Sequence, residues 1–104
     1  MKNLKNKVVV ITGAGSGIGR ALAIEFDKLG AKLALNDFNE KTLHETFSFL
    51  NQNPFYDIFD VSDRAAVFQF AEKVAAHYNA VDVVINNAGI AMNGEGFQDI
   101  DLDK

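Results

Sequence analysis

The fold is decided by the stretch Thr12-Gly13-Ala14-Gly15-Ser16-Gly17-Ile18-Gly19. It follows a β-branched run at residues 8–11 and precedes a segment whose apolar residues recur with helical spacing, which predicts strand, turn and helix. Glycine at every second position leaves little side chain inside the turn, so backbone N–H groups can approach a ligand closely. The helix that follows directs its positive end to the same place. The stretch therefore predicts a site for a phosphate or pyrophosphate group.

Two common nucleotide-binding fingerprints do not fit this turn. The G-x-G-x-x-G pattern fails because Ile18 or Arg20 stands at its third glycine, depending on where the pattern begins. The Walker pattern fails because no Gly-Lys-Ser/Thr follows. The pattern that does fit is T-G-x-x-x-G-x-G over residues 12–19. By itself it leaves open a glycine-rich turn that binds no ligand.

Composition and charge narrow the class of protein. The 104 residues are enough for one domain, 1–104, and a hydrophobic fraction of 48% is typical of a packed protein rather than a disordered one. The absence of cysteine excludes disulfides and thiolate metal sites. A net charge of −4 without a basic cluster argues against nucleic acid or an anionic membrane surface as a partner. No apolar stretch has the form of a membrane span or a signal peptide, so we expect a cytoplasmic protein.

Apolar periodicity predicts strands that alternate with helices. Short apolar runs indicate strands at residues 7–11, 31–35, 55–59 and 81–85. The buried face expected for the first helix consists of Ile18, Leu22, Phe26 and Leu29. For the third helix it consists of Val67, Phe70, Ala71, Val74 and Tyr78. Gly30 is placed to end the first helix, Asn39 to cap the second, and Ser62 to cap the third with Asp63 in its first turn.

This alternation predicts the α/β class, with a doubly wound parallel sheet of the Rossmann-like type and strand order 3-2-1-4. Ligands of such sheets bind at the carboxyl ends of the strands, near the point where the strand order reverses. Four polar motifs fall at such ends, and their convergence is stronger evidence than any one of them. They are residues 12–19, Asp37, Asp60-Val61 and Asn86-Asn87-Ala88-Gly89.

Asp37 is a candidate for recognising the ribose of a dinucleotide. It follows Gly13 by 24 residues and ends the second predicted strand. A carboxylate there can accept hydrogen bonds from both ribose hydroxyls and would repel a 2′-phosphate. No Lys or Arg lies inside the glycine turn or directly after Asp37, so NAD is favoured over NADP. The alternative is an aspartate that only caps a turn. Asp60 ends the third predicted strand, where it could accept a hydrogen bond from the amine of an adenine, form an Asx turn before Ser62, or do both.

Together these motifs resemble the short-chain dehydrogenase/reductase family, and Asn86-Asn87-Ala88-Gly89 is the most specific of them. The resemblance implies an NAD(P)(H)-dependent oxidoreductase that moves hydride between nicotinamide and a small alcohol or ketone, and a homo-oligomer. It implies backbone contacts to the cofactor from Ser16 and Ile18, ribose recognition by Asp37, adenine contacts from Asp60 and Val61, and a sheet-bracing role for Asn86. The full set of cofactor-binding residues expected is Gly13, Ser16, Gly17, Ile18, Gly19, Asp37, Asp60, Val61, Asn87, Ala88 and Gly89.

The sequence departs from this family in its catalytic groups. The family pattern includes Tyr-x-x-x-Lys, but Tyr56 and Tyr78 are the only tyrosines, and Asp60 and Asp82 stand four residues after them. We therefore expect the amino-terminal, cofactor-binding half of such an enzyme, catalytically incomplete by itself. A stand-alone nucleotide-binding module and a self-associating fragment are the alternatives. His44 and His77 lack a partner at metal-ligand spacing, so no metal is expected.

Overall fold

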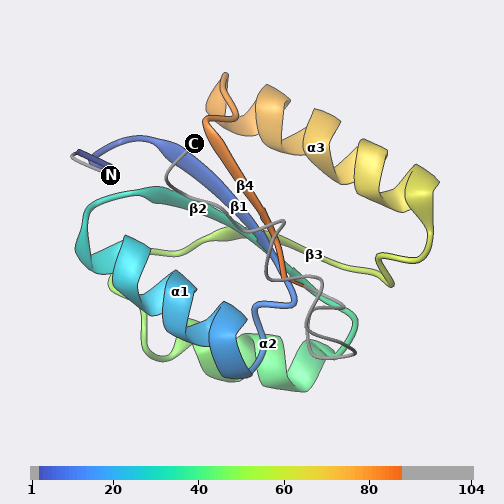
Figure 1. The fold of residues 1–104 in the computed structure, drawn as a ribbon, viewed down its shortest axis with the longest axis horizontal. Coiled ribbons are helices and arrows are strands. Elements are labelled where there is room, and N and C mark those ends of the chain that lie inside the picture. The colour runs from blue at the N-terminus through green and yellow to red at the C-terminus, as the bar shows by residue number, and fades with distance from the viewer. Residues whose placement is uncertain (1–2, 88–104) are drawn as a thin grey trace.

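The computed structural model describes residues 3–87, in which strands and helices alternate along the chain (Figure 1). The elements are β1 (Val8–Thr12), α1 (Gly17–Lys28), β2 (Lys32–Asp37), α2 (Glu40–Phe47), β3 (Phe55–Ile58), α3 (Arg64–Tyr78) and β4 (Val83–Asn86). The four strands form one parallel sheet in the order β3-β2-β1-β4. The predicted α/β class and strand order are therefore confirmed.

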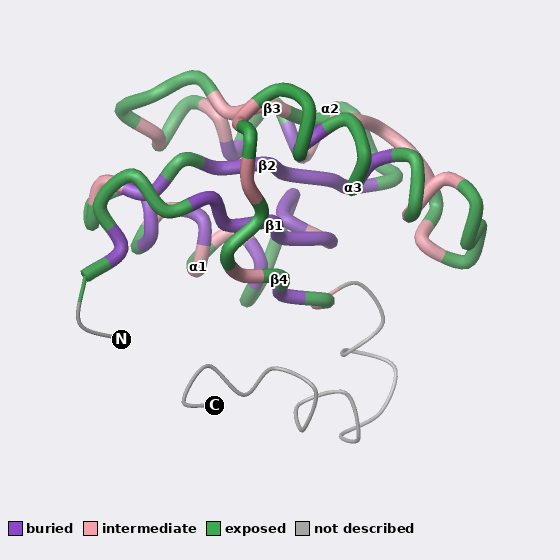
Figure 2. The backbone as a smooth tube through the Cα atoms, turned by 90° about the horizontal axis from the view of Figure 1, so that it is seen from above, coloured by how far each residue is buried: buried purple, intermediate pink, exposed green. Residues whose placement is uncertain are grey.

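Strand β1 is the centre of the sheet. It pairs with β2 from Val8 opposite Lys32, and with β4 from Val9 opposite Val83. All five of its residues are buried, as a β-branched strand covered on both faces should be. Figure 2 shows this burial concentrated in β1 and β2, whereas the outer surfaces of the helices are exposed.

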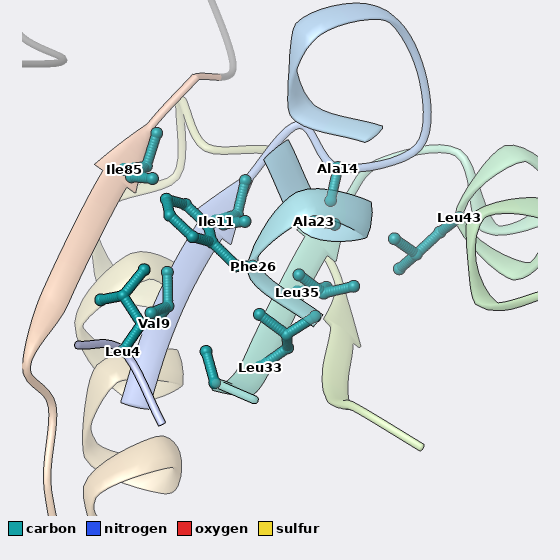
Figure 3. Packing of buried hydrophobic residues seen from close by; sticks show 11 residues of the cluster. Leu4, Val9, Ile11, Ala14, Ala23, Phe26, Leu33, Leu35, Leu43 and Ile85 are labelled. Carbon is teal, nitrogen blue, oxygen red and sulfur yellow. The ribbon is translucent and has the colours of Figure 1, made fainter. Parts of the chain in front are cut away.

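The helices cover both faces of the sheet, α1 and α2 on one and α3 on the other (Figure 1). Successive side chains of a strand point to opposite faces. Val9 and Ile11 therefore enter the core under α1, where Figure 3 shows Phe26 beside Ile11. Val8 and Val10 enter the core under α3, with Phe70. None of the helices within residues 3–87 is long and apolar enough to span a bilayer.

The buried face of α1 differs from the expected one. Phe26 is buried, but Ile18 and Leu29 are 45% and 50% exposed. The buried stripe instead contains Gly19 and Ala23, because small residues allow the helix backbone to approach the sheet closely. On α3, Phe70 and Val74 are buried as expected and Ala71 is exposed. For α1 the prediction weighed large apolar residues and overlooked small ones, whereas on α3 it included the small Ala71, which is not buried.

The cap of α3 also differs from the expected one. The N-cap is Asp63, whose side chain accepts a hydrogen bond from the Ala66 N–H group at 3.2 Å. The Ser62 N–H group instead donates to the Asp60 carboxylate at 2.9 Å, which holds Ser62 in the preceding turn. The predicted Asn39 cap of α2 is confirmed by its bond from the Thr42 N–H group at 3.1 Å.

Candidate cofactor-binding site

The glycine turn lies between β1 and α1 at the carboxyl end of the central strand (Figure 1). Gly13 and Gly17 have φ angles of +66° and +56°, in the left-handed region that favours glycine. A Cβ on Gly17 would meet nothing within 4 Å, so its backbone faces open space. Gly19 is required for a different reason, because its Cβ would overlap the Gly13 carbonyl oxygen.

The carboxylate of Asp37 lies directly against this turn. Its Oδ2 atom accepts a hydrogen bond from the Gly15 N–H group at 2.8 Å, and its Oδ1 atom accepts one from the Asn39 N–H group at 3.1 Å. The residue is only 8% exposed. A Cβ on Gly15 would lie 2.7 Å from Asp37 Oδ2 and 2.5 Å from Thr42 Oγ1, so only glycine allows this approach. Asp37 is thus held in one orientation beside the turn.

The carbonyl groups of the turn are held by side chains that the sequence pattern did not single out. The buried Thr46 of α2 donates from Oγ1 to the Ala14 carbonyl oxygen at 2.8 Å. Arg20 of α1 donates from Nη2 to the Gly15 carbonyl oxygen at 2.6 Å, and from Nε to Thr46 Oγ1 at 2.9 Å. The only signal in the sequence was the position of Arg20 directly after the glycine pattern. The contacts of Thr46 could not be predicted from the sequence, because they depend on how α1 packs against α2.

Asn86, the last residue of β4, and Asn87, which follows it, connect that strand to β1 and the turn. Asn86 Oδ1 accepts a hydrogen bond from Thr12 Oγ1 at 3.0 Å, which agrees with the bracing role expected of Asn86. Asn87 Nδ2 donates to the Gly13 carbonyl oxygen at 3.0 Å. The sheet order explains both contacts, because β4 is the direct neighbour of β1. Ala88 and Gly89 lie outside the described residues.

Asp60 and Val61 lie in the loop between β3 and α3, at the same end of the sheet as the turn. Asp60 is exposed and forms an Asx turn with Ser62. Hydrogen bonds from the Ser62 backbone N–H group and then its hydroxyl lower the pKa of Asp60, so the carboxylate is charged at neutral pH. The Asx-turn reading of Asp60 is therefore confirmed, and its oxygen atoms remain accessible to solvent.

Both tyrosines lie away from the turn. The Tyr78 hydroxyl donates to the Leu33 carbonyl oxygen at 2.9 Å and accepts from the Phe55 N–H group at 3.3 Å. Leu33 and Phe55 are near the starts of β2 and β3, at the opposite end of the strands from the turn. The ring of Tyr56 packs against His44 of α2. The described side chains around the turn can therefore bind and orient a ligand, while neither tyrosine is placed to donate a proton to it.

The family model of the short chain dehydrogenases matches residues 7–104. The chain belongs to the short-chain dehydrogenase family. Its oxidoreductases bind a nicotinamide cofactor on a Rossmann-type sheet, and the resemblance drawn from the glycine turn, Asp37 and the Asn-Asn-Ala-Gly motif is thereby confirmed.

Individual relatives agree with this assignment. A protein of Mycobacterium tuberculosis named "Putative oxidoreductase SadH" is 47% identical over 97 residues, covering 90% of this chain and 35% of its own length. Estradiol 17-beta-dehydrogenase 11 of Macaca fascicularis is 38% identical over 108 residues, covering 99% of this chain and 36% of its own. A short chain dehydrogenase/reductase from Burkholderia phymatum, solved in complex with NAD, has a TM-score of 0.75 at 37% identity, over 81% of this chain and 31% of that one. This short-chain dehydrogenase chain thus spans about a third of the length of the relatives it matches.

Proposed function

We propose that this chain binds NAD(H) for an oxidoreductase that transfers hydride between the cofactor and a small alcohol or ketone. The observation that carries the proposal is the Asp37 carboxylate, held beside the glycine turn by the Gly15 and Asn39 N–H groups. A carboxylate fixed at the end of β2 is an acceptor for the two hydroxyls of an adenosine ribose. The complex of the Burkholderia phymatum relative with NAD supports the same cofactor class.

The preference for NAD over NADP rests on the charges around Asp37. A 2′-phosphate would bring its negative charge next to this carboxylate, which costs binding energy unless a cation compensates it. The turn contributes the uncharged Ser16, and the exposed Phe38 follows Asp37. Arg20 is near the turn, but its guanidinium is bonded to the Gly15 and Thr42 carbonyl oxygens at 2.6 and 3.0 Å. It is therefore committed to the protein rather than to a phosphate.

The remaining contacts are proposed from the resemblance and from the positions of the residues. Backbone N–H groups of Ser16 and Ile18 bind the pyrophosphate, at the start of α1 where the helix dipole favours negative charge. Asp60 and Val61 contact the adenine. The other proposed cofactor-binding residues are Gly13, Gly17, Gly19, Asn87, Ala88 and Gly89.

Bound NAD(H) supplies or accepts the hydride, and the groups of this chain bind and orient it. Reduction of a carbonyl also needs a proton donor near its oxygen atom. Tyr78 cannot serve, because its hydroxyl is bonded between Leu33 and Phe55 far from the turn. We therefore propose that residues beyond this chain complete the catalytic site. The absence of Tyr-x-x-x-Lys from the sequence also favours the second candidate, a nucleotide-binding module without catalysis.

Calorimetry with the complete protein tests the cofactor assignment. We expect NAD(H) to bind more tightly than NADP(H), and Asp37→Ala to narrow the gap because the carboxylate that repels the 2′-phosphate is removed. Glu25→Ala is the matched control, since it removes one exposed negative charge from α1. Tighter binding of NADP(H) by the unmodified protein would contradict the assignment.

A turnover assay separates the two candidate functions. NADH absorbance is followed with a panel of secondary alcohols and ketones, using the complete protein and the 104-residue chain in parallel. The oxidoreductase is supported by turnover in the complete protein that the 104-residue chain does not show. Cofactor binding without turnover in the complete protein supports the binding module.

A further inference from the structure

Three consecutive peptide units of the glycine turn are held by other parts of the chain. In the first, the Gly13 carbonyl oxygen accepts from Asn87 and the Ala14 N–H group donates to the Asn36 carbonyl oxygen at 2.8 Å. In the second, the Ala14 carbonyl oxygen accepts from Thr46 and the Gly15 N–H group donates to Asp37. Both units are thus bonded at both ends, within the protein.

The third unit is different, because it is held through its carbonyl group. The Gly15 carbonyl oxygen accepts a hydrogen bond from Arg20 Nη2 at 2.6 Å, a short distance typical of a charged donor. In a planar trans peptide the N–H group points away from the C=O group. The Ser16 N–H group therefore points away from Arg20, and the next residue, Gly17, has free space where a Cβ would lie.

Arg20 is itself locked in this position by several contacts. Its Nη2 atom also donates to the Thr42 carbonyl oxygen at 3.0 Å and lies 3.4 Å from Glu45 Oε1, and its Nε atom donates to Thr46 Oγ1 at 2.9 Å. Its guanidinium carbon lies 5.5 Å from the centre of the Phe49 ring. A planar guanidinium can make these contacts together, whereas the single ammonium group of lysine cannot.

From these contacts we propose that Arg20 is a positioning residue for cofactor binding. It holds the Gly15–Ser16 peptide so that the Ser16 N–H group faces the pyrophosphate, while it touches no part of the cofactor itself. Thr46 acts in the same way on the Ala14–Gly15 peptide and orients Arg20. The inference rests on the proposed NAD(H) binding. It means that α2, through Thr42 and Thr46, fixes the conformation of the turn that binds the pyrophosphate.

The test compares ligands that share adenosine but differ in phosphate. Dissociation constants for NAD⁺, NADP⁺, ADP and adenosine are measured for the complete protein and its Arg20→Met, Arg20→Lys and Thr46→Val variants. We expect Arg20→Met to weaken NAD⁺ and ADP by about tenfold, the factor that corresponds to one hydrogen bond to a charged group. The affinity for adenosine, whose binding depends on Asp37, should change less than about twofold. Arg20→Lys should have affinities for NAD⁺ and ADP between those of Arg20→Met and the unmodified protein. Lys28→Met is the control, since it removes an exposed cation from the last turn of the same helix.

Hydrogen exchange in the ligand-free protein provides a second readout. Peptides covering residues 12–20 should exchange faster in Arg20→Met and Thr46→Val, with little change in β1–β4. A general loss of stability would instead raise exchange throughout the sheet and weaken adenosine as much as ADP, and that result would overturn the inference.

Two further outcomes would also overturn it. Equal ADP binding by Arg20→Met and the unmodified protein would remove the role of Arg20 and leave the proposed function intact. Selective loss of NADP⁺ binding in Arg20→Met would mean that Arg20 binds a 2′-phosphate. If the unmodified protein binds neither NAD⁺ nor ADP, the proposed function fails, and the inference fails with it.

Discussion

Gly17 and Gly19 belong to the same sequence pattern, but the structure gives them different physical reasons. Gly17 has φ of +56° and free space where a Cβ would lie. At Gly19 a Cβ would overlap the Gly13 carbonyl oxygen and lie 2.6 Å from Asn87 Nδ2. Because the carbonyl belongs to the backbone, it cannot rotate away as a side chain could. The two positions should therefore respond differently to substitution.

The magnitudes follow from these contacts. Gly17→Ala places an L-residue in the left-handed region, which costs about 1–2 kcal/mol of unfolding free energy. Gly19→Ala forces the turn apart at a cost of roughly 1–3 kcal/mol. It also disturbs the hydrogen bond from Asn87 to Gly13, a further loss of about 0.5–1.5 kcal/mol. We expect a total loss of roughly 1.5–4.5 kcal/mol for Gly19→Ala.

Asparagine substitutions separate the two causes. Asparagine accepts the left-handed conformation better than alanine does, so Gly17→Asn should be less destabilising than Gly17→Ala. Gly19→Asn brings the same Cβ into the same overlap, so it should be at least as destabilising as Gly19→Ala. The measurement is urea unfolding of the complete protein followed by circular dichroism, with NAD⁺ affinity as a second readout. Equal losses for Gly17→Ala and Gly19→Ala, or rescue of both positions by asparagine, would refute the reasoning.

Three other predictions concern the fold around the site. Tyr78→Phe should cost about 1–3 kcal/mol, because the Leu33 carbonyl and Phe55 N–H groups lose their partner. Burial raises the pKa of Tyr78 above 10.0, so the unmodified protein should lose stability as the pH rises above 10. The difference in unfolding free energy between it and Tyr78→Phe, measured by urea unfolding, should therefore shrink at high pH. A difference that does not change with pH would count against this. Asp63→Ala should lower the unfolding free energy by about 1 kcal/mol through loss of the α3 cap, and Ser62→Ala should lower it by much less. If thermal unfolding showed Ser62→Ala to be the more destabilised variant, Ser62 rather than Asp63 would be the cap. Within residues 3–87, β4 is the last strand of the sheet and carries Val84, which is 60% exposed. Because an unpaired strand edge and an exposed apolar side chain favour association, the 104-residue chain should self-associate. Sedimentation as a monomer at high concentration would contradict this.

The order of elements was predictable from the sequence because local patterns carry it. The run at residues 8–11 reads as a buried strand because its β-branched residues fit a sheet covered on both faces. The glycines after it end the strand and begin a helix. Parallel strands joined by short helical crossovers then leave few alternative topologies. The buried face of α1 was less predictable, since close packing at Gly19 and Ala23 leaves no strong apolar signal.

The candidate site divides in the same way. The sequence by itself determined that a glycine turn, Asp37 and two asparagines meet at one end of a parallel sheet, because each follows a strand. Only the tertiary structure decided how the turn is held. The bond from Thr46 to Ala14 joins residues that are distant in the sequence, and the contacts of Arg20 with Thr42 and Thr46, which hold it against the turn, depend on α2 packing beside α1. Such contacts have no periodicity or local propensity, so they exist only once the helices are in place.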